Sequence, residues 1–230
     1  MLRLLDGREP AVSRRLVDLS HTVADGLETY PGLPAPAISD HLSRAASRAH
    51  YAPGTEFQIG RIEMVANTGT YLDAPFHRFE GAMDLAELPL ERLADLRGVV
   101  IDATAVRRRI DIETLPAGDL RDCAVLFRTG WSRHFATPGY AVGHPFLTGA
   151  VAEQLVLRGA ALVGIDSLNI DDMDDGARPV HTALLRAGIP IVEHLTGLEL
   201  LQGEVFRFFA VPVKVRGMGT FPVRAFASVG

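Results

Sequence analysis

The sequence contains a single cysteine in 230 residues, Cys123, and this excludes an internal disulfide bond. Cys123 precedes the strand-like run Ala-Val-Leu-Phe-Arg, so we predict a buried structural thiol here rather than a nucleophile. The sequence also lacks any apolar stretch close to the roughly 18 residues that a membrane-spanning helix needs. Charge interrupts residues 1–9 too early for a secretory signal, so we expect a cytoplasmic protein with no membrane partner.

An excess of basic charge is also missing. The formal net charge is −5, and a content of 47% hydrophobic and 22% charged residues is ordinary for a soluble globular protein. Without a basic face to offset phosphate repulsion, nucleic acid is not an expected partner. The three consecutive arginines at 107–109 lie beside acidic residues, and this pattern predicts a solvated loop.

The length and the hydrophobic pattern favour one large α/β domain spanning residues 1–230. Helical periodicity covers 148–158 and 180–187, and a glycine follows each segment. A strand-like run comes directly after each helix, an order typical of parallel crossovers within a mixed sheet. We predict a polar loop at 35–55 and strands at 16–20, 57–66, 98–103, 124–129, 160–165, 189–192 and 206–215.

A short polar strip at 67–77 follows the run 57–66, whose alternation predicts a half-buried strand that enters the core. The strip contains Asn67, Tyr71, Asp73 and His77. Side chains on an irregular segment that leaves a rigid strand commonly line a pocket. A carboxylate and an imidazole four residues apart are suited to metal binding or proton transfer.

This strip resembles the signature of the bacterial kynurenine formamidase and putative cyclase family, His-x-Gly-Thr-His-x-Asp-Ala-Pro-x-His. The two metal-binding histidines of that pattern are replaced in this sequence by Asn67 and Tyr71. The other positions match in register: Gly69, Thr70, Asp73, Ala74, Pro75 and His77. The resemblance implies a central barrel-like mixed sheet flanked by helices, metal-dependent hydrolysis of a small molecule, and a homodimer or homotetramer.

The resemblance extends to later segments, over about residues 15–215. His181 and Glu193 lie where the family has the ligands of its second metal ion, and Trp131 lies in a segment that helps to wall the family's pocket. A carboxylate such as Glu193 at the end of an apolar strand would be costly to bury without a partner. The resemblance therefore implies a metal set of Asp73, His181 and Glu193, with His77 moving protons.

Other candidate residues have plainer interpretations. His194 is adjacent to Glu193 on a strand, so it faces the other way and is predicted to be structural. His21 is likewise predicted to be structural rather than catalytic. Asp166 and the acidic run 171–175 lack the spacing of a calcium-binding EF-hand, so we predict a solvated loop.

The two replacements leave three hypotheses open. The first is a hydrolase of a small amide, formamide or lactone that uses one divalent ion, zinc or manganese, with His77 as base and Asn67 and Trp131 contacting the substrate. The second is a metal-poor or metal-free cyclase or dehydratase, in which Tyr71 and His77 do acid–base work on a carbonyl compound. The third is a degenerate relative that only binds a small ligand. Tyr71 is either catalytic or simply fills the volume of a lost metal.

Overall fold

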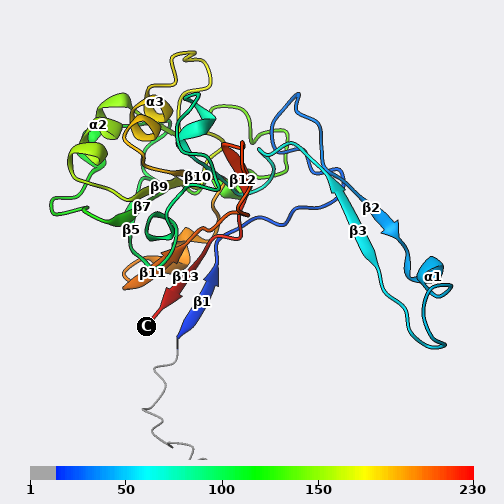
Figure 1. The fold of residues 1–230 in the computed structure, drawn as a ribbon. Helices are drawn as coiled ribbons and strands as arrows, with labels where there is room; N and C mark the ends of the chain where they lie inside the picture. The colour runs from blue at the N-terminus through cyan, green and yellow to red at the C-terminus, as the bar shows by residue number, and fades with distance from the viewer. Residues whose placement is uncertain (1–13) are drawn as a thin grey trace, which may run out of the picture.

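The computed structural model describes residues 14–230. The segment 1–9, whose charges argue against a secretory signal, lies outside that range. The centre of the structure is a curled nine-stranded mixed sheet (Figure 1). Strands β5, β7, β9 and β10 are parallel, and antiparallel strands continue the sheet on both sides. The order is β1 (Arg15–Asp18), β13 (Phe226–Val229), β11 (Phe206–Phe209), β5 (Leu96–Asp102), β7 (Cys123–Arg128), β9 (Leu162–Ile165), β10 (Ile191–Glu193), β4 (Tyr71–Asp73) and β12 (Thr220–Pro222).

Two helices make the crossovers between the parallel strands, as the sequence predicts. Helix α2 (Gly149–Leu157) joins β7 to β9, and α3 (Pro179–Arg186) joins β9 to β10. The Thr148 hydroxyl caps α2 by accepting a hydrogen bond from the amide of Val151 at 3.3 Å. The expected glycines follow both helices with left-handed backbones, φ +73° at Gly159 and +72° at Gly188. The predicted α/β class is confirmed, with a barrel-like curl and few helices.

The sheet separates two hydrophobic cores, because successive side chains of its central strands point to opposite faces. From β7, Val125 and Phe127 pack with the buried faces of α2 and α3. Leu126 faces the other core, where Leu72 and Phe208 also lie. Cys123 is fully buried on the helical side, so the prediction of a buried thiol is correct.

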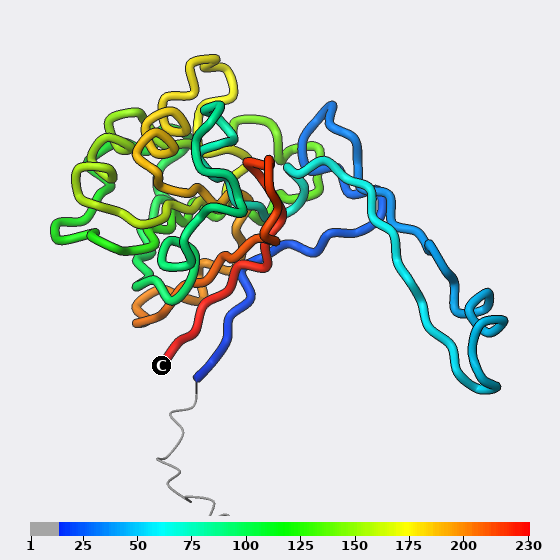
Figure 2. Tube along the Cα trace, viewed as in Figure 1, coloured from blue at the N-terminus to red at the C-terminus, as the bar shows by residue number. Residues whose placement is uncertain are grey.

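A long hairpin arm, residues 37–63, extends away from the sheet (Figures 1 and 2). It pairs β2 (Ala37–Leu42) with β3 (Ile59–Glu63) and carries the one-turn helix α1 (Arg44–Ser47). The prediction that 57–66 is a half-buried strand entering the core is wrong, since every residue of β3 is exposed. The predicted loop at 35–55 is also wrong in part, because β2 and α1 form there. Alternation of apolar and polar residues fits a free hairpin as well as a core strand.

Several short elements were not foreseen. The strand predicted at 206–215 ends at Phe209, and the strands β4, β12 and β13 were missed. Another parallel pair joins β6 (Arg109–Ile110) to β8 (Phe146–Leu147). The 3-10 helices are η1 (Pro75–His77), η2 (Leu90–Arg92), η3 (Ile112–Thr114), η4 (Trp131–His134) and η5 (Leu198–Leu201).

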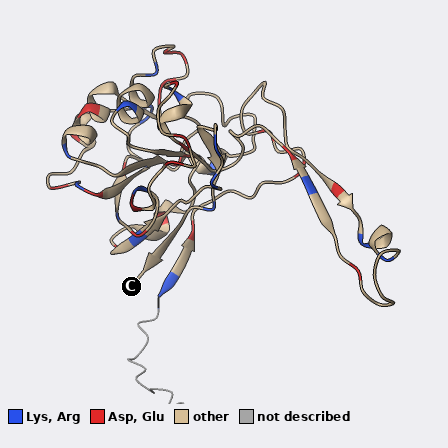
Figure 3. Ribbon diagram, viewed as in Figure 1, with Lys and Arg blue, Asp and Glu red and all other residues tan. Residues whose placement is uncertain are grey.

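Positions of Lys and Arg and positions of Asp and Glu are interspersed along the ribbon of the described residues (Figure 3). The arginine run predicted as a solvated loop is exposed, and Arg108 pairs with Asp172 at 2.8 Å and with Asp174 at 3.2 Å. None of the helices within residues 14–230 has the length and apolar character needed to span a membrane. The oligomeric state stays a prediction.

Candidate active site

The sheet register brings the strip at 67–77 against segments more than 100 residues later in the chain. Strand β4 pairs with β10 on one side, where Tyr71 lies opposite Glu193. On its other side β4 pairs with β12, where Asp73 lies opposite Thr220. Tyr71 and Asp73 point to one face of β4 because they are two residues apart, while Leu72 points into the core. The site therefore depends on strand pairing rather than on the strip alone.

A cavity of about 300 Å³ lies above these strands and is lined by both halves of the predicted site. Its size is at the lower end of the range for small-molecule pockets. Asn169 lines it as well and donates a hydrogen bond of 2.7 Å to the hydroxyl of Tyr30. The predicted site residues in the lining are Asn67, Tyr71, His77, His181 and Glu193.

Glu193 is almost fully buried, and both of its carboxylate oxygens accept hydrogen bonds. The Tyr71 hydroxyl donates to Oε2 at 2.6 Å, and the amide of Ile170 donates to Oε1 at 2.6 Å. Burial raises the pKa of Glu193 to about 7, an effect to which Asp73 adds and which His181 opposes. Burial likewise raises the pKa of Tyr71 well above its usual value, with Glu193 adding to the effect. Tyr71 is thus a neutral phenol that donates to Glu193.

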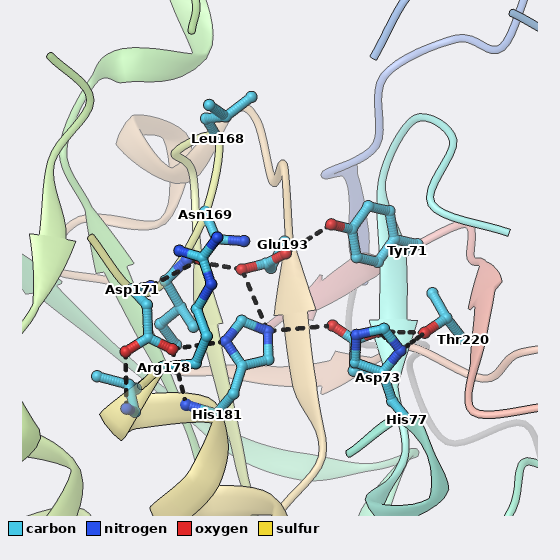
Figure 4. A network of polar contacts seen from close by, with 12 residues as sticks. Tyr71, Asp73, His77, Leu168, Asn169, Asp171, Arg178, His181, Glu193 and Thr220 are labelled. Carbon is cyan, nitrogen blue, oxygen red and sulfur yellow. Dashed lines mark hydrogen bonds and ion pairs between the residues drawn. The ribbon is translucent and has the colours of Figure 1, made fainter. Parts of the chain in front are cut away.

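His181 lies between three carboxylates (Figure 4). Its Nδ1 lies 2.7 Å from Oδ2 of Asp171, and its Nε2 lies 3.7 Å from Oδ2 of Asp73 and 3.8 Å from Oε1 of Glu193. Burial alone would lower the pKa of His181, but Asp171, Asp73 and Glu193 raise it to about 10. An Nδ1–H held by Asp171 leaves Nε2 directed at the other two carboxylates.

The acidic residues predicted to form a solvated loop include two that are buried, so that prediction is wrong for Asp166 and Asp171. Asp171 also accepts hydrogen bonds from the amides of Val180 and His181, at 2.7 and 3.0 Å, which caps α3. Asp166 accepts hydrogen bonds from the amides of Thr129 and Gly130, at 2.6 and 2.9 Å. Both carboxylates accept hydrogen bonds from backbone amides, so they organise the backbone instead of facing solvent.

His77 follows β4 on η1, and its side chain is 36% exposed towards the cavity. Its Nδ1 lies 2.8 Å from the hydroxyl of Thr220, and that hydroxyl also contacts Oδ1 of Asp73. A hydroxyl that donates to the carboxylate accepts from Nδ1–H, and this tautomer leaves Nε2 of His77 with a free lone pair. Thr220 is therefore a site residue that sequence reasoning missed.

Asp73 has a buried oxygen with no hydrogen-bond partner among the described residues, Oδ2. A buried carboxylate oxygen without a partner is costly, and a cation is one group that would offset the cost. Ligand atoms of Asp73, His77 and His181 all lie within 4.8 Å of one another. The donors present, carboxylate oxygen and imidazole nitrogen, suit a divalent cation such as zinc or manganese, so the residues fit a metal site.

The remaining candidates do not line the cavity. Trp131, expected in the pocket wall, is not part of the cavity lining, and its indole Nε1 donates to the carbonyl of Tyr140 at 2.9 Å. His194 is fully buried with its Nδ1 2.8 Å from the Tyr140 hydroxyl, and burial lowers its pKa to about 3. His21 stacks on Phe135 with ring centroids 3.7 Å apart. Both histidines have the packing contacts of structural residues.

Known proteins resemble this chain over nearly its whole length. A kynurenine formamidase of Erythrobacter litoralis (strain HTCC2594) is 28% identical over 202 residues, 88% of each chain. A kynurenine formamidase of Salinibacter ruber (strain DSM 13855 / M31) is 28% identical over 215 residues, 91% of this chain and 95% of the relative.

Solved structures agree with this result. A potential metal-dependent hydrolase with cyclase activity superposes with a TM-score of 0.74 and 26% identity, covering 94% of this chain and 98% of the other. An isatin hydrolase bound to the product analogue thioisatinate has a TM-score of 0.79 at 19% identity, with coverage of 94% and 92%, and shows the same fold. The expectation of an enzyme in the hydrolase class is confirmed by these relatives. The family described as putative cyclase matches residues 17–172, and the chain belongs to this family.

Proposed function

We propose that this chain hydrolyses the C–N bond of a small amide, with formamides and lactams as the first candidates. The observation that supports the proposal is the buried Oδ2 of Asp73, which has no hydrogen-bond partner within the described part of the chain and lies 3.7 Å from Nε2 of His181, a residue that lines the small cavity. The formamidase and hydrolase relatives give the bond type. The cavity volume of about 300 Å³ fits a small molecule as the reacting group.

In this proposal His77 is the general base. Its free Nε2 faces the cavity, takes a proton from the attacking water and returns it to the leaving amine. As the imidazolium forms, Thr220 and the carboxylate of Asp73, whose Oδ1 lies 3.8 Å from Nδ1, stabilise the positive charge. The hydrogen bond to Thr220 also holds the ring in one orientation, which favours productive proton transfer.

Asp73, His181 and Glu193 are the proposed ligands of one divalent cation, zinc or manganese. A cation there supplies Lewis-acid polarisation of the scissile carbonyl. Hydrogen bonds to Glu193 from Tyr71 and to His181 from Asp171 are the outer contacts that orient metal ligands. His77 is the competing third ligand, since its nitrogen also lies near Asp73 and His181. Metal content measured in Glu193→Gln and in His77→Gln separates the two ligand sets. The variant that loses metal identifies the third ligand.

The alternative, a metal-poor cyclase or dehydratase, needs Tyr71 as an acid towards the substrate. The phenol already donates to Glu193 at 2.6 Å, and its pKa is raised well above the usual value by burial. Donation to a substrate would break that bond and leave Glu193 buried with fewer partners. The geometry therefore favours a supporting role for Tyr71, which orients Glu193.

Hydrolysis of formanilide by the purified full chain tests the proposal. With added manganese or zinc, formate and aniline should appear in equal amounts, and a chelator should stop the reaction. A matched control is the His134→Gln variant, because His134 lies on η4 outside the cavity lining. No release of formate, with cyclic or dehydrated products formed instead from a carbonyl substrate, would favour the alternative.

A further inference from the structure

Two arginines line the same cavity as the proposed active site. Arg78 follows His77 directly, and Arg178 stands three residues before His181. Glu193 also lines the cavity and is a buried acid. The cavity therefore combines a buried carboxyl group with two guanidinium groups.

Arg178 holds an unusual backbone conformation for its residue type. Its φ of 49° and ψ of 59° lie in the left-handed region, which costs free energy for any residue other than glycine. The residue stands at the start of α3 without a side-chain cap, because the Asp171 carboxylate binds the first amides of that helix. Arg178 is the one residue with this backbone conformation, glycine aside, in the cavity lining among residues 14–230, which makes its side chain a candidate for a function there.

The Arg178 side chain is anchored but not neutralised. Its Nη1 donates to the carbonyl of Asp172 at 2.7 Å, which fixes the half-buried side chain beside His181 (Figure 4). Among residues 14–230, no carboxylate lies within 4 Å of the guanidinium of Arg178 or of Arg78. Arg108, by contrast, contacts both Asp172 and Asp174. An anchored guanidinium with free N–H groups can donate hydrogen bonds to an anion that is not part of the chain.

We propose that Arg178, assisted by Arg78, binds a carboxylate of the substrate, so that the preferred substrates are small amides carrying an acid group. This inference rests on the proposed function. The planar guanidinium matches a carboxylate in a two-point contact. Leu33 and Met173, also in the lining, offer apolar contact to the body of such a substrate. Arg178 then acts as a specificity residue, while the reacting amide lies over Asp73 and His77.

The test compares formanilides of three kinds: the parent compound, its ring-carboxylate isomers, and the matching neutral carboxamides. The carboxamides control for electronic effects of the ring substituent. We expect at least one carboxylate isomer to exceed its carboxamide in kcat/KM by about 10- to 100-fold, chiefly through a lower KM, as for a charge-assisted hydrogen-bonded pair.

Arg178→Gly is the most informative variant, because it removes the guanidinium and glycine adopts φ 49° without strain. The carboxylate-to-carboxamide ratio should fall towards one, while the melting temperature is maintained or rises. Arg78→Gln should lower the ratio less. Arg186→Gln is the control, since Arg186 lies over the Phe79 ring at 5.3 Å, the same distance as Arg78, but outside the cavity lining. It should leave the ratio unchanged.

Each outcome decides the question. Equal hydrolysis of carboxylates and carboxamides by the natural protein overturns the inference and leaves the proposed amidase intact. A ratio that persists in Arg178→Gly together with Arg78→Gln also overturns it. If none of these formanilides is hydrolysed, the proposed function is overturned, and the inference with it.

Discussion

Asp73→Asn should reduce amide hydrolysis at least as much as removal of a general base does, by a factor of about 10² to 10⁴ or more. The change replaces the unpartnered Oδ2, or its neighbour, with an amide that carries no charge and cannot ligate a cation through nitrogen. Metal content should fall in parallel. The shape of the side chain is retained, so Thr220 keeps an acceptor and the fold should survive.

The matched control is Asp172→Asn, one residue after the buried Asp171. The Asp172 side chain is partly exposed and pairs with Arg108 at the surface, a contact of little energetic value. Its activity and metal content should equal those of the natural protein. Activity that survives in Asp73→Asn while it is lost in His77 variants would show that the reaction is not centred on a cation.

His77→Ala should lower kcat by a factor of about 10² to 10⁴ with little effect on stability. The His77 side chain is 36% exposed, so its removal leaves no buried cavity, and Thr220 keeps its contact with Asp73. The measurement is kcat together with the melting temperature. A structural histidine would give the reverse pattern, with a lower melting temperature and unchanged activity per folded molecule.

Metal analysis of His77→Ala tests independently whether His77 is a base or a metal ligand. If His77 is the base and Glu193 the third ligand, metal content is unchanged although activity is lost. If metal content falls as well, His77 belongs to the ligand set that includes Asp73 and His181. His134→Ala provides a matched loss of a histidine outside the cavity.

Local patterns predicted the parts of the fold that are determined locally. The periodicity of 148–158 appears as α2 and the glycine stop follows it, since each signal acts within one or two turns. Three-residue strands such as β4 and β12 carry no such signal, because their position is set by pairing with distant segments. The alternation of 57–66 predicted a strand correctly but not its exposure, which depends on what packs against it.

The sequence likewise predicted only some residues of the candidate site. Resemblance to the family identified Asp73 and His77 in the strip and His181 and Glu193 in later segments as candidates. In the structure Nε2 of His181 lies 3.7 Å from Asp73 and 3.8 Å from Glu193, and Nδ1 of His77 lies 3.8 Å from Asp73. Asp171 and Thr220 were missed because an acidic run and a lone threonine are ordinary in sequence. Their importance comes from contacts to His181 and His77. Likewise, the role of Tyr71 becomes apparent only when its hydroxyl is found on Glu193.

The number of divalent ions bound per chain tests whether hydrolysis depends on one cation in the site. The full chain, purified without chelator and loaded with zinc or manganese, should hold one divalent ion by plasma mass spectrometry. Asn67 and Tyr71 stand where the family resemblance implies the imidazole ligands of another ion. Formanilide hydrolysis should rise in proportion to the bound ion and stop when it is removed. Two tightly held ions per chain, or full activity in protein stripped of metal, would show that hydrolysis does not depend on a single bound cation.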